Sequence, residues 1–166
     1  HVAVWHLPAE LGRLSNLEKL KISCCSQLWT LPPELGHLQR LKQLEIVTCA
    51  QLSDLPAEVR HLQSLRSLII KDCDWLERLP EELCEVGSLL HITLERCRWL
   101  RTLPDNFGNP ESLFSLHIEG CCRLQILPDH IGNLGRLWSL HIECCECFGI
   151  MPKHIGQLHW QLQSLP

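Results

Sequence analysis

The chain has 166 residues, 45% of them apolar, and a formal net charge of −4 at pH 7. This charge offers no basic face for nucleic acid, and no apolar run approaches the roughly 18 residues of a membrane helix. We therefore expect neither nucleic-acid binding nor membrane insertion.

A sequence frame that repeats every 24 residues dominates the chain. It is complete at residues 17–32, where it reads L-x-x-L-x-I-x-x-C-x-x-L-x-x-L-P, and it returns without insertion. The repeats begin near residues 17, 41, 65, 89, 113 and 137. A fixed period in this range indicates leucine-rich repeats. The expected fold is an α/β solenoid shaped like a horseshoe, with a parallel concave sheet and short helical or 3-10 turns on the convex side.

The sequence begins and ends inside a repeat. Trp5 and Leu7 stand in register with Trp29 and Leu31, and Pro166 comes one residue after a strand leucine. Solenoids cover their end repeats with polar caps, and neither end offers one. We therefore expect residues 1–166 to form a single leucine-rich-repeat domain that is a fragment of a longer protein.

The L-x-I segment of each repeat alternates apolar and polar residues, which predicts a half-buried strand. In the second repeat, Leu44 and Ile46 should point inward, while Gln43, Glu45 and Val47 point outward. Two inward columns are expected to form the core. The first is Leu20, Leu44, Leu68, Ile92, Leu116 and Leu140, and the second is Ile22, Ile46, Ile70, Leu94, Ile118 and Ile142.

Six of the eleven cysteines share one column after the strand: Cys25, Cys49, Cys73, Cys97, Cys121 and Cys145. A column of identical residues stacks on itself, so partners for disulfides do not alternate. Free cysteine behaves as a small buried hydrophobe with a weak S–H donor. We expect these thiols to contact backbone groups of the turn, in a reduced, cytoplasmic setting.

After the cysteine, each repeat runs to a Leu-Pro pair and then to P-x-x-[LI]-G-x-L. Proline suits the first position of a short helix, and glycine is expected to end it. The glycines in question are Gly12, Gly36, Gly108, Gly132 and Gly156. Arg60 and Cys84 take this place in two repeats, where we expect an irregular turn or a non-glycine residue in the left-handed conformation.

The frame fails after Gly156, because Gln161 stands where leucine is expected and Leu162 follows. Two interpretations remain open. The chain either has a one-residue insertion before a last strand at 162–165, or continues as an unrelated segment. A seventh repeat is therefore not predicted.

The frame resembles the repeats of plant intracellular disease-resistance proteins, the nucleotide-binding (NB-ARC) leucine-rich-repeat receptors. Cysteine stands where many other subfamilies have asparagine, and C-x-x-L replaces N-x-L. The resemblance covers residues 4 to about 160. It implies plant defence signal transduction, in which the repeats sense a pathogen effector or host protein and contact other domains of the receptor to inhibit it.

The same resemblance implies that ADP or ATP binds a nucleotide-binding domain elsewhere in the receptor. The phosphate-loop motif G-x-x-x-x-G-K-[ST] does not occur in residues 1–166, so no cofactor contact is expected here. We expect this part to be non-catalytic, because an open sheet does not exclude water or bury a base. The alternatives are a scaffold in small-GTPase or kinase signalling, and repeats attached to a kinase or ubiquitin ligase domain.

The outward columns of the concave sheet are the default binding surface. The first column is Lys19, Gln43, Ser67, His91, Ser115 and Ser139. The second column is Lys21, Glu45, Ile69, Thr93, His117 and His141. The third column is Ser23, Val47, Lys71, Glu95, Glu119 and Glu143. A flanking column consists of Glu18, Lys42, Arg66, Leu90, Phe114 and Trp138.

The last three repeats gather aromatic and charged residues on this surface, a combination that suits a protein interface. The candidate partner-binding residues are Leu90, Phe114, Trp138, His117, His141, Glu119 and Glu143. The plainer interpretation is that they are ordinary surface residues of a diverging repeat. The tryptophans of the loops, Trp29, Trp75 and Trp99, are expected to pack between repeats.

Two sharper hypotheses concern the same end of the chain. The cysteines at 121, 122, 144, 145 and 147, near His141, have residue types that bind zinc. However, the column thiols should point inward and His141 outward, so no metal site is expected there. Oxidation of Cys122, Cys144 or Cys147 on exposure to air is expected instead of metal binding. The other hypothesis is that His117 above His141 senses pH, although exposed histidines seldom do.

Overall fold

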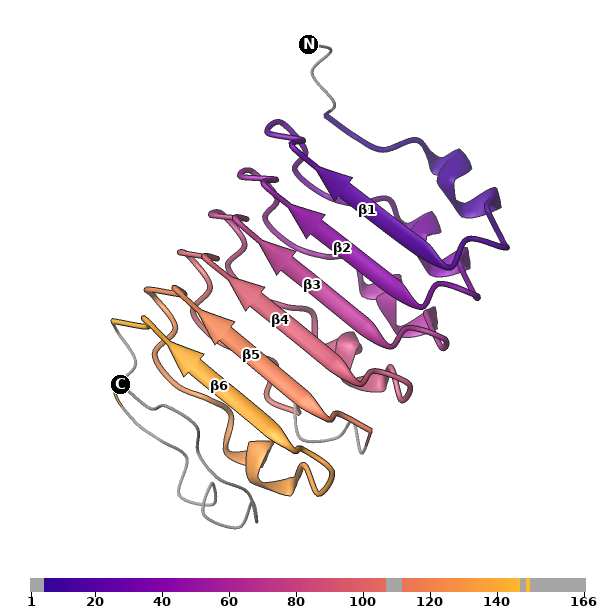
Figure 1. The fold of residues 1–166 in the computed structure, drawn as a ribbon. Helices are drawn as coiled ribbons and strands as arrows, with labels where there is room; N and C mark the ends of the chain where they lie inside the picture. Colours follow the sequence, from indigo (N-terminus) through magenta and orange to yellow (C-terminus); the bar gives the residue numbers. More distant parts are fainter. Residues whose placement is uncertain (1–4, 107–111, 147–148, 150–166) are drawn as a thin grey trace.

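A computed structural model of the chain describes residues 5–106, 112–146 and 149. In these residues, six strands form one parallel sheet in chain order (Figure 1). The strands are β1 (Lys19–Ser23), β2 (Gln43–Val47), β3 (Ser67–Lys71), β4 (His91–Glu95), β5 (Ser115–Glu119) and β6 (Ser139–Glu143). The 3-10 helices are η1 (Ala9–Arg13), η2 (Pro33–His37), η3 (Ala57–His61), η4 (Glu81–Glu85) and η5 (Asp129–Asn133).

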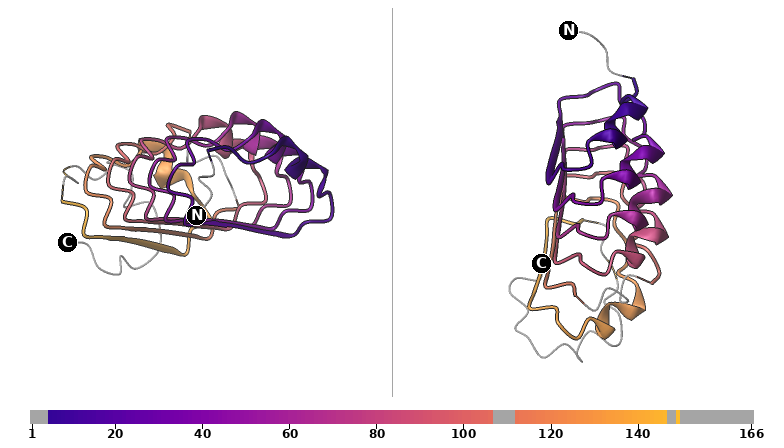
Figure 2. Two further views of the ribbon diagram at one scale, coloured as in Figure 1. Left: turned by 90° about the horizontal axis from the view of Figure 1, so that it is seen from above. Right: turned by 90° about the vertical axis from the view of Figure 1, so that its right-hand side faces the viewer.

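The sheet forms one layer of the molecule and the 3-10 helices form the opposite layer, as both views in Figure 2 show. The helices lie on the outer, convex side of the stack. This arrangement confirms the predicted solenoid. Gly108, Cys147, Gly156 and the segment at 162–165, on which several expectations rest, lie outside the described residues.

Neighbouring strands pair without any shift from the 24-residue period. Lys19 lies beside Gln43 at one end of the sheet, and Ser115 lies beside Ser139 at the other. Parallel strands are about 4.8 Å apart, so each side chain contacts its equivalents in the adjacent repeats. The alignment of the predicted columns is thereby confirmed.

The inward columns form the core, as predicted. Leu44 and Ile46 have no exposed surface, and the described part of the chain buries no polar or charged residue. Leu20 and Cys25 were expected in the core but are only partly buried. The reason is their position, since β1 is the first strand of the described sheet and no described strand covers its outer edge.

The column cysteines close the turn that follows each strand. Each thiol donates to the backbone carbonyl two residues earlier: Cys25 Sγ is 3.5 Å from the Ser23 oxygen, and Cys73 Sγ is 3.4 Å from the Lys71 oxygen. The expected contact between thiol and turn backbone is thus confirmed. Burial raises the pKa of Cys49 to about 11 and that of Cys73 to about 12.

In the five described 3-10 helices, the proline of the Leu-Pro pair lies one residue before the helix, not at the first helical position. Pro32 has φ −69° and ψ 145°, an extended conformation, and its carbonyl accepts the N–H of Leu35 at 3.0 Å. The fixed φ of proline suits this extended residue equally well, and its missing N–H costs nothing there.

The glycines of the convex turns have a different role from the one predicted. Gly12 and Gly36 lie inside η1 and η2, which continue for one more residue, and neither has a positive φ. They are needed because the next repeat is close. A Cβ on Gly36 would lie 2.7 Å from the carbonyl oxygen of Glu58, and one on Gly12 would lie 2.7 Å from that of Glu34.

The left-handed residues lie elsewhere in the repeat, immediately before the column cysteine. Their φ values fall between 51° and 64°, and they are Cys24, Thr48, Asp72, Arg96, Gly120 and Cys144. Arg60 and Cys84, where an irregular or left-handed turn was expected, lie in ordinary five-residue 3-10 helices, so that expectation was wrong. Gly120 has the residue type that adopts this conformation most readily, and Asp72 has one that adopts it more often than most.

Replacing Gly36 with alanine should destabilise the fold by about 1–3 kcal/mol, because the added methyl overpacks against the backbone of η3. Gly87→Ala is the matched control, since a Cβ there meets nothing within 4 Å. It should leave stability unchanged or raise it by about 0.4–1 kcal/mol. Urea unfolding followed by circular dichroism measures both, and equal losses in the two variants would contradict this account.

Alkylation should separate the cysteines into two groups. Cys24 and Cys144 are exposed, whereas Cys49 and Cys73 are buried. A thiol with a pKa near 11 is about one-thousandth ionised at pH 8, and the thiolate is the reactive form. Brief treatment of the reduced protein with iodoacetamide, followed by mass spectrometry, should label Cys24 and Cys144 in the folded state. Equal labelling of Cys49 and Cys73 before denaturation would refute the expectation.

Candidate functional site

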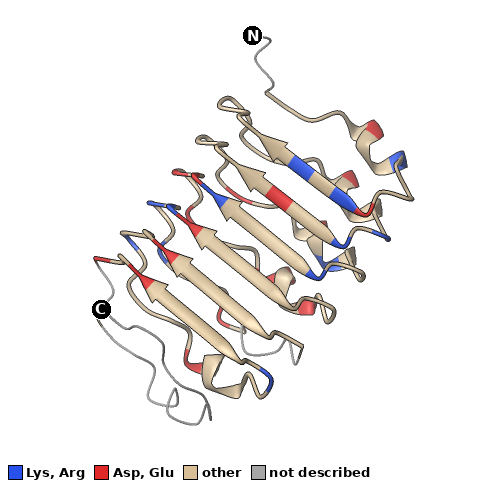
Figure 3. Ribbon diagram, viewed as in Figure 1, with Lys and Arg blue, Asp and Glu red and all other residues tan. Residues whose placement is uncertain are grey.

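The outward columns change charge along the sheet. Lysines and arginines lie mainly on the first three repeats, whereas acidic residues occupy the carboxyl ends of β4, β5 and β6 (Figure 3). The acidic residues are Glu95, Glu119 and Glu143, which lie beside one another in register. The late repeats therefore carry an acidic row, which crosses the carboxyl ends of β4, β5 and β6.

A column of one leucine and two aromatic residues, here called the aromatic ladder, lies at the opposite ends of the strands, just before β4, β5 and β6. Its members are Leu90, Phe114 and Trp138. The N–H of Phe114 donates to the Leu90 carbonyl, and the N–H of Trp138 to the Phe114 carbonyl, both at 2.8 Å. The Phe114 and Trp138 rings stack with centroids 6.4 Å apart, and His91 meets Phe114 edge-on at 6.0 Å. Leu90 is half-buried, but Phe114 is 44% and Trp138 71% exposed.

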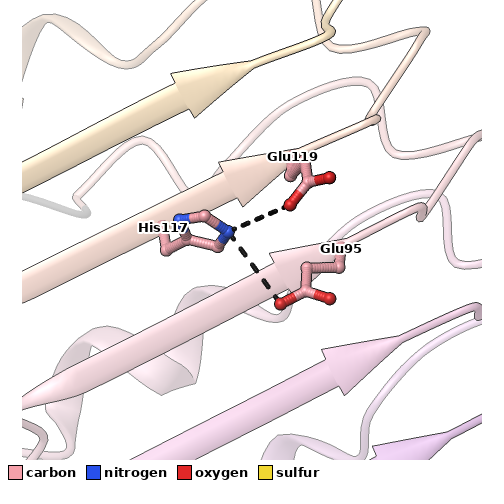
Figure 4. Close-up of side chains that lie close together, drawn as sticks. All are labelled: Glu95, His117 and Glu119. Atoms are coloured by element: carbon pink, nitrogen blue, oxygen red, sulfur yellow. Dashed lines mark ion pairs between the residues drawn. The ribbon is translucent and has the colours of Figure 1, made fainter. Parts of the chain in front are cut away.

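Two histidines stack between the aromatic ladder and the acidic row. The His117 and His141 rings are 4.6 Å apart and nearly parallel. His117 Nε2 lies 3.5 Å from Glu119 Oε2 and 3.9 Å from Glu95 Oε1, as Figure 4 shows. His141 Nε2 lies 3.0 Å from Glu143 Oε2. The structure therefore brings all seven candidate residues onto one surface of three adjacent repeats.

The candidates chosen from the sequence omitted Glu95 and two residues that contact it, Lys71 one repeat earlier and Arg96 beside it. Lys71 Nζ is 2.7 Å from Glu95 Oε1, and Arg96 Nη1 is 3.8 Å from Glu95 Oε2. Arg96 also makes a two-point contact with Asp72, at 2.6 and 3.0 Å, which lowers the pKa of that carboxyl. The signal was present, since Lys71 and Glu95 belong to the third outward column.

The loop tryptophans form a second aromatic surface. Trp75 and Trp99 stack with centroids 5.9 Å apart, and the Arg123 guanidinium lies 3.6 Å from the centre of the Trp99 ring. Packing between repeats is thus confirmed for this pair. Trp29 and Trp75 nevertheless keep 56% and 57% of their surface exposed.

The late cysteines are divided between core and surface. Cys121 and Cys145 are buried with their thiols on backbone carbonyls, Cys122 is half-buried and Cys144 is exposed. Two hollows lie away from the strands, around the segments that lead into η3 and η4, and Asp54 and Arg78 line both.

Comparison with known proteins agrees with this geometry. The leucine-rich-repeat family model matches residues 16–38. The leucine-rich-repeat domain of the type III effector XopL superimposes with a TM-score of 0.64 at 24% identity, covering 95% of this chain and 71% of that one. The chain has the leucine-rich-repeat fold. None of the curated proteins matches the sequence.

Two other solved structures that superimpose on this chain are much longer than it. A plant ice-binding protein gives a TM-score of 0.61 at 22% identity, and a chain of the Drosophila Toll–Spatzle complex gives 0.62 at 23%. This leucine-rich-repeat chain covers 46% of the former and 19% of the latter, with 85% and 86% of its own length aligned. In the described residues, no helix has the length and apolarity needed to cross a membrane.

Proposed function

We propose that this leucine-rich-repeat domain binds a protein ligand through the late repeats of its sheet, as a non-catalytic recognition module. The observation that supports this most is the exposed stack of Phe114 and Trp138. Aromatic side chains bury large areas at little entropic cost and are enriched among the residues that dominate binding energy. Backbone hydrogen bonds fix the chain that carries both rings, and the rings stack on each other in the absence of a partner.

The surroundings of the ladder suit a protein more than a small molecule. Polar and charged groups border the aromatic rings on the sheet face, as in the rim of a protein interface. A sheet surface presents aligned side chains over several repeats and does not enclose a small ligand. His117, His141, Glu119 and Glu143 would supply the polar contacts that fix the orientation of the partner.

We further propose that the domain is the sensing and autoinhibitory part of a cytoplasmic plant immune receptor. The C-x-x-L and Leu-Pro frame of the repeats supports this. Its partners would then be an effector or host protein and the other domains of the receptor, where ADP or ATP would bind. The fold also occurs in the Arabidopsis receptor kinase HAESA, solved in complex with a peptide hormone, at a TM-score of 0.55 and 20% identity over 82% of this chain and 27% of that one.

The double variant Phe114→Ala/Trp138→Ala should lose partner proteins that the wild-type domain retains from plant tissue. Loss of a dominant aromatic contact costs about 2 kcal/mol or more, which corresponds to about 30-fold weaker binding. Trp75→Ala, on the other exposed stack, is the matched control and should retain the same proteins. Quantitative mass spectrometry of the captured proteins compares the three. Equal retention by the double variant, or equal loss with Trp75→Ala, would contradict the proposed surface.

The receptor assignment is tested by the coding sequence upstream of residue 1. We expect a phosphate-loop motif G-x-x-x-x-G-K-[ST] within a nucleotide-binding domain on that side. Recombinant protein that includes this domain should bind ADP in a manner that depends on the motif lysine. A kinase or ubiquitin-ligase domain in its place, or a start codon followed directly by a capping segment, would refute the assignment.

A further inference from the structure

Three side chains on the sheet face have donor atoms that converge. They are Glu95 on β4 and His117 and Glu119 on β5, and one atom of each lies within 4.8 Å of the others (Figure 4). We propose that these residues bind a divalent transition-metal ion, with Zn²⁺ as its representative. The site shares His117 and Glu119 with the proposed protein-binding surface, but it needs no group from a partner and can be tested without one.

The distances fit a metal ion after small movements. Zinc binds imidazole nitrogen and carboxylate oxygen at about 2.0–2.2 Å, so two tetrahedral ligands are about 3.4 Å apart. His117 Nε2 is 3.5 Å from Glu119 Oε2 and 3.9 Å from Glu95 Oε1. The Glu95 and Glu119 carboxylates lie within 4.8 Å of each other, and rotation of the more exposed Glu119 side chain would bring them to the separation that a metal ion needs.

The donor set selects the class of metal. One imidazole and two carboxylates suit Zn²⁺ and its neighbours in the first transition row, whereas Ca²⁺ and Mg²⁺ prefer sites built from oxygen alone. Stacking on His141 at 4.6 Å holds the plane of the His117 ring, which keeps Nε2 directed between the two carboxylates. Three protein ligands leave a coordination position for water.

The negative charge of the acidic row favours the binding of a cation. Glu95, Glu119 and Glu143 lie beside one another in register, and like charges placed opposite each other destabilise a sheet. In the described part of the chain, Lys71 and Arg96 form ion pairs with Glu95, whereas the ion-pair contacts of Glu119 and Glu143 are with imidazoles. A divalent cation would neutralise the excess charge at Glu119.

The Lys71 ammonium competes with a metal ion for the Glu95 carboxylate, so a variant of Lys71 tests the site. Its ammonium lies 2.7 Å from the same Glu95 oxygen that faces His117. Removing this positive charge with Lys71→Met should strengthen Zn²⁺ binding, because the ion no longer competes with the ammonium. Nonspecific adsorption to surface carboxylates elsewhere would not respond to this change.

Isothermal titration of the reduced protein with Zn²⁺ at pH 7 tests the site, with circular dichroism to verify that each variant is folded. His117→Asn and Glu119→Gln should each bind at least tenfold more weakly, since even loss of a residue that supports a metal ligand costs 10–100-fold. His91→Asn is the matched control, an exposed imidazole of β4 outside the cluster, and should bind as the wild type does.

Cobalt distinguishes this site from the cysteines. Co²⁺ bound by nitrogen and oxygen lacks the intense thiolate-to-metal charge-transfer absorption that cysteine ligands produce. The proposal expects Co²⁺ binding without that absorption and its displacement by Zn²⁺. Failure of the wild type to bind Zn²⁺, binding that persists in both His117→Asn and Glu119→Gln, or a thiolate spectrum would each overturn it.

Discussion

Parallel pairing without a shift places each strand residue beside the residues 24 positions before and after it in the chain. This one constraint governs both faces of the sheet. Inside, it forces apolar residues to stack on apolar residues, and it produces the continuous leucine, isoleucine and cysteine columns of the core. Because nothing polar is buried in the described residues, the core carries no desolvation penalty from a charge.

On the surface, the same constraint couples neighbouring repeats through charge. Within the described residues, five ion pairs link residues 24 apart: Lys21–Glu45, Lys42–Glu18, Lys71–Glu95, Arg96–Asp72 and Arg98–Asp74. Exposed pairs of this kind contribute about 0–1 kcal/mol each, so the buried columns, not these pairs, stabilise the stack. The pattern ends at β5, where His-x-Glu stacks on His-x-Glu and like charges meet. A bound ligand of positive charge would offset this repulsion.

The period alone was sufficient to predict the columns, because a 24-residue register with no insertion leaves one alignment of Leu44, Ile46 and their equivalents. The period was insufficient for features that depend on which groups lie close together in space. Glycine in a turn suggests a special backbone conformation, but Gly36 is required by the nearness of Glu58, which the pattern does not encode. The left-handed column was missed because Thr48 and Asp72 stand where glycine would have signalled it. The approach of His117 to Glu95 depends on side-chain rotation as well as register.

The left-handed column also bears on how such a domain can change. Residues as different as Thr48, Arg96 and Gly120 adopt nearly the same φ there, so the backbone of a repeat does not depend on which of them is present. Repeats are thus interchangeable units, and a deletion of 24 codons keeps every remaining column of residues in alignment. Loss of residues 97–120 would place β6 directly against β4 and keep the core, while erasing the histidine stack. Deletion of a single repeat can therefore change the binding surface while the remaining columns keep their alignment.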